Sequence, residues 1–144
     1  MRATGLVIAT LLGLFAGAPG ATAQDYCGTD EWNHNGSAMD VHICSGEVSI
    51  FYKRPRAALL ASGVGPGTLL FRGRFLPQEI TGDTTVDEVS RLGGTAYVFR
   101  AGCPPAPYPV RGTMHARIEL SGEAPVRGGG CRVERHRRDV LVFD

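Results

Sequence analysis

The chain has 144 residues, with 15 Lys and Arg against 14 Asp and Glu and a net charge of +1. This balance argues against a protein that binds nucleic acid through its overall charge, so we expect no nucleic-acid partner. Hydrophobic residues form 43% and charged residues 20% of the chain, which excludes a disordered polyelectrolyte. The 20 Gly and 9 Pro predict many turns between short elements and argue against a helical bundle.

Residues 1–23 have the pattern of a signal peptide. Arg2 supplies a positive start, an apolar run covers residues 6–16, and Ala21-Thr22-Ala23 forms a small-residue end. We therefore predict cleavage before Gln24 and a periplasmic or extracellular location, with residues 24–144 forming a single β-rich exported domain. The apolar run is too short to span a bilayer, and no second stretch of about 20 apolar residues follows it. We expect no transmembrane segment.

All four cysteines lie in the exported part: Cys27, Cys44, Cys103 and Cys131. An even number of cysteines in an oxidising compartment predicts two disulfides. Three pairings are open, and we favour Cys27–Cys44 and Cys103–Cys131 because each closes a local loop. A zinc site is the alternative. No two cysteines stand two to four residues apart, and His42 and Cys44 are too close for the usual ligand spacing, so we expect no metal and no other cofactor.

The first half of the exported part contains one clear hairpin. Residues 39–43 and 48–52 alternate between apolar and polar side chains, which is typical of strands, and Ser45-Gly46 between them is typical of a tight turn. Residues 57–60 predict a single helical turn. A loop at residues 62–67 then leads into a third strand over residues 68–73.

Further strands are predicted through the rest of the chain, at intervals of eight to twelve residues. We expect them at 75–81, 94–99, 110–113, 116–120, 131–135 and 140–143. Residues 83–88 are an acidic surface excursion, and the run Cys103–Pro109 predicts a polyproline-like connection that either displays Tyr108 or forms a rigid crossover. The spacing predicts an all-β fold, a small antiparallel barrel or sandwich of about eight short strands with two disulfides.

Three stretches carry a resemblance to a known group of proteins. Residues 67–73 (GTLLFRG), 94–99 (GTAYVF) and 103–112 (CPPAPYPVRG) resemble an uncharacterised family of small exported proteobacterial β-rich proteins. The family is similar to modules found behind caspase-like peptidase domains. The resemblance covers residues 32–143 and implies a bacterial accessory domain without a particular reaction. This chain has no peptidase part, so no catalytic residue carries over.

A first candidate binding site lies at residues 32–37, which are too polar for a core strand. Trp32 offers a flat apolar face beside the side chains of His34 and Asn35, and such a mixture can stack on a sugar ring and hydrogen-bond its hydroxyls. The alternative is an ordered loop in which Trp32 plugs one end of the fold and the amides cap turns.

A second candidate site is the densest basic run of the chain, between residues 127 and 138. It contains Arg127, Arg132, Arg135, His136, Arg137 and Arg138. The run is suited to a polyanion, with Arg135 and Arg137 as the ligand-binding residues. The alternative is an edge strand whose charges prevent strand-to-strand aggregation.

No residue is predicted to be catalytic. No serine lies in a Gly-x-Ser-x-Gly elbow, and Gly63-x-Gly65-x-Gly67 lacks the preceding strand and the lysine of a phosphate-binding loop. We therefore expect an exported binding domain. Its partner is either a cell-envelope glycan or a protein such as an envelope hydrolase that it inhibits. The alternative is a small exported enzyme that uses a histidine.

Overall fold

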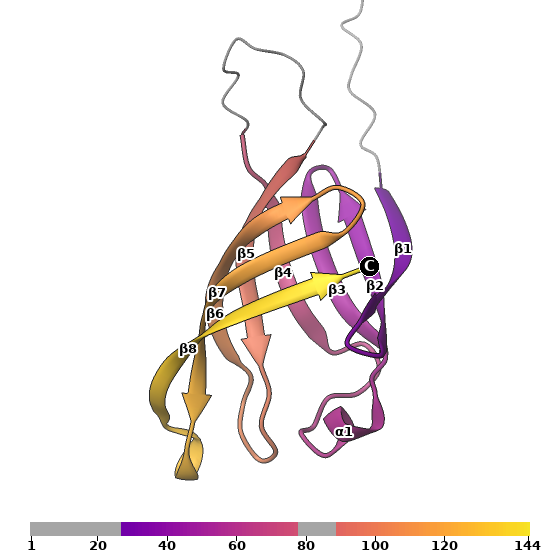
Figure 1. Ribbon diagram of the computed structural model, residues 1–144. Coiled ribbons are helices and arrows are strands. Elements are labelled where there is room, and N and C mark those ends of the chain that lie inside the picture. The colour runs from indigo at the N-terminus through magenta and orange to yellow at the C-terminus, as the bar shows by residue number, and fades with distance from the viewer. Residues whose placement is uncertain (1–26, 78–88) are drawn as a thin grey trace, which may run out of the picture.

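The computed structural model describes residues 27–77 and 89–144, which form one sheet of eight antiparallel strands (Figure 1). The predicted all-β class is confirmed, and the sheet is not closed into a barrel. Its strands lie in chain order. They are β1 (Cys27–His34), β2 (Ser37–Cys44), β3 (Glu47–Arg54), β4 (Leu69–Phe75), β5 (Ser90–Val98), β6 (Ala106–Met114), β7 (Ile118–Arg127) and β8 (Val133–Phe143).

Two tight turns organise the first three strands. Asn35-Gly36 joins β1 to β2 and Ser45-Gly46 joins β2 to β3, and all four residues have positive φ, from 49° to 80°. Such two-residue turns match the twist of an antiparallel hairpin. The predicted hairpin is confirmed as β2–β3. The expectation that residues 32–37 are too polar for a core strand was wrong for residues 32–34, which belong to β1: Trp32 and His34 face inward, while Asn33 between them faces outward.

The second half has fewer and longer strands than expected. Residues 133–135 of the segment predicted at 131–135 and all of 140–143 belong to one strand, β8. The strand β6 begins at Ala106, inside the predicted proline connection. Pro107 and Pro109 pair with β5, while β6 pairs with β7 only from Val110 onward. Prolines are tolerated there because that stretch has a neighbour on one side only. Residues 78–81 of the predicted fourth strand and the acidic excursion at 83–88 lie outside the described residues.

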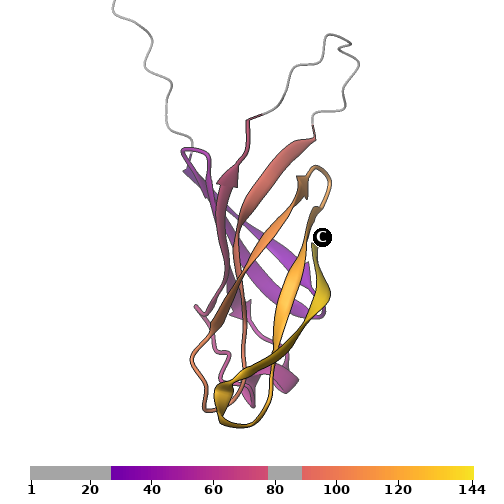
Figure 2. The ribbon, with the colours of Figure 1, turned by 90° about the vertical axis from the view of Figure 1, so that its left-hand side faces the viewer.

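The core lies between the two halves of the curled sheet, with β1–β3 on one side and β6–β8 on the other (Figures 1 and 2). Its fully buried side chains include Met39, Val41, Val48, Ile50, Phe71, Leu92, Ile118, Leu120 and Phe143. Glycines allow neighbouring strands to bend closely over one another. A Cβ atom on Gly112 would lie 1.7 Å from the carbonyl oxygen of Glu119 on β7. The sheet can therefore coil tightly only without a side chain at this position.

The first and last strands approach each other at one end of the molecule. Asn33 and Asp144 exchange two backbone hydrogen bonds, with N···O distances of 2.6 and 3.1 Å. Elsewhere along the described residues the ladders join only strands that are consecutive in the chain. The edges of β1 and β8 therefore meet at this end without forming a closed ladder.

Both predicted disulfides are present. Cys27–Cys44 joins the start of β1 to the end of β2, and Cys103–Cys131 joins the β5–β6 connection to a short 3-10 helix, η1 (Gly129–Cys131). Disulfides of this kind are typical of proteins from oxidising compartments. The predicted helical turn is confirmed as α1 (Ala57–Leu60), and no helix among the described residues is long and apolar enough to cross a membrane.

Candidate functional site

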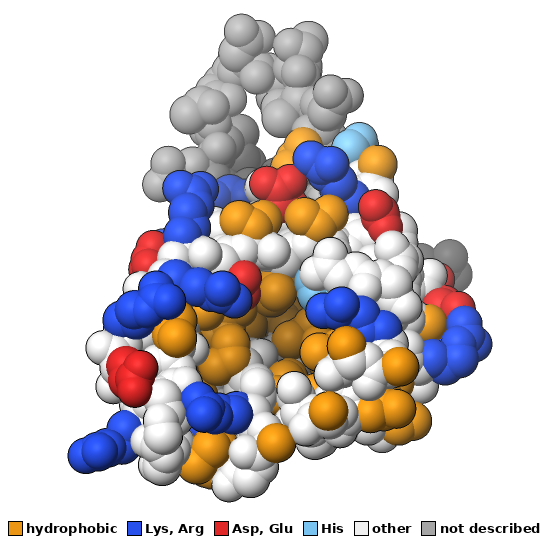
Figure 3. All heavy atoms as spheres, turned by 60° about the horizontal axis from the view of Figure 1, so that its bottom comes forward, with side chains coloured by type: hydrophobic (Ala, Val, Ile, Leu, Met, Phe, Trp, Pro, Cys, Tyr) orange, Lys and Arg blue, Asp and Glu red, His pale blue; other side chains and the backbone are white. Residues whose placement is uncertain are grey.

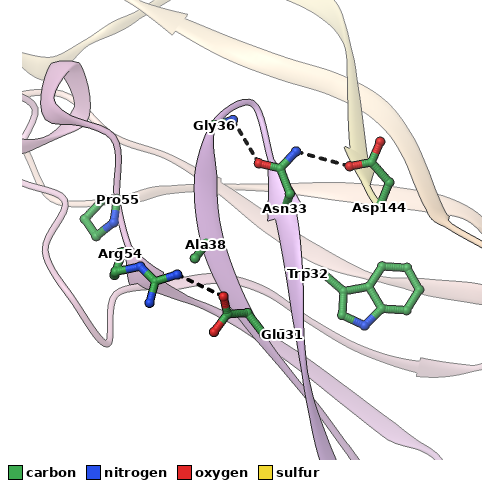
Figure 4. A pocket seen from close by; sticks show the side chains of 8 residues that line it. All are labelled: Glu31, Trp32, Asn33, Gly36, Ala38, Arg54, Pro55 and Asp144. Carbon is green, nitrogen blue, oxygen red and sulfur yellow. Dashed lines mark hydrogen bonds and ion pairs between the residues drawn. The ribbon is translucent and has the colours of Figure 1, made fainter.

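Of the predicted sugar-binding residues, Trp32 and His34 lie on the same inward face of β1, and Asn35 lies in the turn that follows the strand. Trp32 is half-buried and packs against the core, opposite the fully buried Met39 of β2. Figure 4 shows its ring on the side of β1 away from Arg54 and Pro55. The outward-facing Asn33 uses its amide within the fold: Nδ2 donates to Asp144 Oδ1 at 3.1 Å, and Oδ1 accepts from the backbone N–H of Gly36 at 3.2 Å.

His34 is integrated into the core. The residue is 6% exposed, and its ring stacks on Phe143 with a centroid distance of 4.7 Å. Nδ1 lies 2.8 Å from the carbonyl oxygen of Val142 and therefore carries the proton that it donates. Nε2 then accepts from Asn35 Nδ2 at 3.4 Å. Burial lowers the pKa of His34, so the neutral ring is favoured in the folded protein.

A groove of about 580 Å³ runs along this end of the sheet, between β1 and the start of the β3–α1 connection (Figure 4). Its charged groups are engaged with one another. Glu31 Oε2 lies 2.8 Å from Lys53 Nζ, and Glu31 Oε1 lies 2.9 Å from Arg54 Nη2. These contacts lower the pKa of Glu31. The groove thus offers Trp32 at one side and an ion-paired wall at the other, and the predicted residues Trp32, His34 and Asn35 do not point into it together.

A second hollow lies where β5 and β7 end and β8 begins. Figure 3 shows this end of the molecule hollowed, with hydrophobic side chains in its depth and Lys or Arg side chains around its rim. A pocket of about 400 Å³ lies here, which we call the mouth pocket. Its walls are Val98, Phe99, Ala124, Pro125 and Val126, and its charged residues are Arg100, Arg127, Arg137 and Asp139.

Asp139 is held on the inner face of β8, the face that carries the buried Leu141 and Phe143. The hydroxyl of Tyr108 on β6 donates to Asp139 Oδ2 at 2.6 Å. Burial and this hydrogen bond raise the pKa of Tyr108 far above its ordinary value, so the phenol keeps its proton. Burial also raises the pKa of Tyr52 to about 12, with a further contribution from the charge of Asp139.

The three arginines of the mouth pocket differ in their partners. Arg100 donates to the carbonyl oxygen of Arg127, and Arg127 donates to those of Pro104 and Val98. The backbone of Arg137 belongs to the ladder between β7 and β8, but its guanidinium has no hydrogen-bond or ion-pair partner in the described ranges 27–77 and 89–144. Carbonyl partners fix a guanidinium without neutralising it, so the pocket retains a positive excess.

The predicted basic run is thereby divided by the alternation of β8. Arg137 lines the mouth pocket, and Arg135 lies two residues earlier on the same face, exposed. His136 and Arg138 lie on the other face. Because β8 pairs with β7 alone apart from the contact at Asp144, it is an edge strand, as the alternative interpretation requires.

Tyr108 and Asp139 were not predicted as a pair. Tyr108 was expected on an exposed or rigid connection, yet it is 4% exposed and belongs to β6. The available signal was the alternation of Tyr108, Val110 and Gly112, which the flanking prolines concealed. Asp139 and Phe99 carried no signal, because only the pairing of distant strands brings them to one end of the sheet.

No protein-family model, curated protein or solved structure matches the chain. None of the four histidines lines the mouth pocket. Among the described residues, no three His, Cys, Asp or Glu side chains gather so that they could hold a metal ion.

Proposed function

We propose that this protein is an exported binding domain of the cell envelope, and that it binds its ligand in the mouth pocket. The observation that carries the proposal is a 400 Å³ hollow with apolar walls and a few convergent charged groups. Small-molecule sites typically have this size and this composition. The signal-peptide pattern of residues 1–23, with cleavage before Gln24, and the two disulfides support export to the periplasm or beyond.

Binding is preferred over catalysis by a histidine because of where the histidines lie. The buried His34 uses Nδ1 on a backbone carbonyl, and the pocket contains no histidine. The partner classes are those expected from the sequence, a cell-envelope glycan or an envelope protein such as a hydrolase. The relationship to modules behind caspase-like peptidase domains also stays a prediction.

The test compares two neighbouring arginines on opposite faces of β8. Immobilised protein covering residues 24–144 is exposed to solubilised envelope material, and the retained glycan and protein are quantified. Arg137→Glu places a negative charge in the pocket and should abolish retention. Arg138→Glu makes the same charge change on the outer face and should leave it intact.

Two results would count against the mouth pocket. Equal losses in both variants would favour diffuse attraction along the β8 edge. Full retention in both variants would show that the pocket takes no part in binding. Thermal unfolding of each variant verifies that the fold is unchanged.

A further inference from the structure

The charges of the mouth pocket limit the ligands that it can bind. Three arginines and one carboxylate line it, so its net charge is positive. Arg100 and Arg127 are fixed by carbonyl oxygens, whereas the guanidinium of Arg137 has no hydrogen-bond partner within the described residues. A carboxylate or phosphate group on the ligand would give Arg137 a bidentate partner. The ligand should therefore be an anion.

Asp139 adds a second requirement. One of its oxygens accepts the Tyr108 hydroxyl at 2.6 Å, and the other has no hydrogen-bond partner within residues 27–77 and 89–144. A ligand that covered this carboxylate with hydrocarbon would remove water from a charged group without replacing its hydrogen bonds. An acyl chain is therefore a poor occupant. The ligand must bring a hydroxyl or another donor to Asp139.

The apolar walls add a third requirement. Phe99 lines the pocket together with Pro125 and Val126. Its ring contacts that of Tyr52 edge-on, with a centroid distance of 6.2 Å. Such walls can pack against the C–H face of a ligand ring, while the hydroxyls of that ring hydrogen-bond to the charged groups. A zwitterionic amino acid satisfies Asp139 and Arg137 but leaves the positive excess of the pocket uncompensated.

We infer that the mouth pocket binds an anionic sugar, whose acidic group lies on Arg137 and one of whose hydroxyls donates to Asp139. This inference rests on the proposed function, because it names the ligand class of the same pocket. The acidic group is either a carboxylate, as in a uronate, or a phosphate, as in a sugar phosphate.

The experiment is a titration of 15N-labelled protein, residues 24–144, followed by NMR and by calorimetry. The probes are glucuronate, glucose 6-phosphate, glucose, leucine and octanoate at millimolar concentrations. We expect at least one anionic sugar to bind roughly tenfold or more tightly than glucose, with shifts centred on residues 98–100, 124–127 and 137–139. The stronger of the two anionic probes identifies the acidic group.

Three variants assign the contacts. Arg137→Gln should remove the preference for the anionic sugar over glucose, while Arg138→Gln on the opposite face should keep it. Asp139→Asn still accepts the Tyr108 hydroxyl and should weaken anionic sugar binding roughly tenfold by replacing the carboxylate that receives the ligand hydroxyl. Thermal unfolding verifies that each variant folds.

Equal binding of glucose, leucine or octanoate would overturn the inference, as would an Arg137→Gln variant that keeps its preference. If no anionic sugar binds while envelope material is still retained through Arg137, the ligand class is wrong and the proposed function stands. If Arg137→Glu retains envelope material and no probe shifts the pocket residues, both fail.

Discussion

Burial of the ring of His34, which stacks on Phe143, lowers its pKa and outweighs the opposing effect of the hydrogen bond to the backbone of Val142. In the unfolded chain the ring of His34 is not buried, so it takes up a proton at a higher pH than it does in the folded protein. The neutral ring therefore contributes stability that is complete above the unfolded pKa of about 6.5 and is lost as the pH falls through the lower folded value.

The first prediction follows from this difference. The free energy of unfolding should decrease as the pH is lowered from about 7.5 to about 5, and this decrease should be smaller in His34→Gln than in the wild type. Urea denaturation at each pH measures it. The exposed His42 provides the control, and His42→Gln should keep the wild-type slope. Parallel curves for the wild type and His34→Gln would contradict the assignment.

Trp32 gives the second prediction at this scale. Since its ring packs against the core, Trp32→Ala should lower the free energy of unfolding by about 3 kcal/mol. Val133→Ala, at a side chain that is 49% exposed, should cost far less. An unchanged stability together with lost retention of envelope glycan would instead make Trp32 the sugar platform considered from the sequence.

At the scale of elements, local patterns identified most strands but not their lengths. The alternation of Met39, Val41 and Ile43 was sufficient for β2, because apolar and polar positions follow each other without interruption. On β8 the inner positions are Arg135, Arg137 and Asp139 near the mouth and apolar only toward the C-terminus. A strand whose inner face changes from charged to apolar has no single local pattern, so it was divided into two, and the pocket that it completes was not foreseen.

Gly112 provides a test of how the elements bend. A methyl group there would lie against the backbone of β7, so Gly112→Ala should lower the free energy of unfolding by more than about 2 kcal/mol. Gly65→Ala is the control, because no atom lies within 4 Å of its added Cβ. Chemical denaturation measures both. Equal stabilities would mean that the strands separate easily at this point.

At the scale of the whole molecule, the two disulfides reinforce different regions. Cys27–Cys44 fixes the acidic first hairpin, and Cys103–Cys131 fixes the loops beside the mouth pocket. The pocket residues Arg100 and Arg127 lie within four residues of these cysteines, so the second disulfide restrains the arginine positions. The predicted pairing succeeded because the antiparallel order brings both pairs together: Cys27 and Cys44 are partners across β1 and β2, and the hairpin β6–β7 returns the chain from Cys103 to Cys131 at the same end of the sheet.

Export gives the last prediction. Intact-mass measurement of the periplasmic or secreted protein should show a chain that begins at Gln24, with all four thiols protected from alkylation before reduction. A species that retains Met1, carries a lipid or reacts at its cysteines in the native state would contradict the proposed export.

The chain-order arrangement of the strands also bears on how the protein folds. Each strand pairs with the one synthesised immediately before it, so the sheet can grow hairpin by hairpin as the chain emerges. Contacts between nearby segments form faster than contacts across long loops, because less chain entropy is lost in closing them. The bonds between Asn33 and Asp144 close the longest loop. They should therefore form last, after both disulfide-linked regions have taken shape.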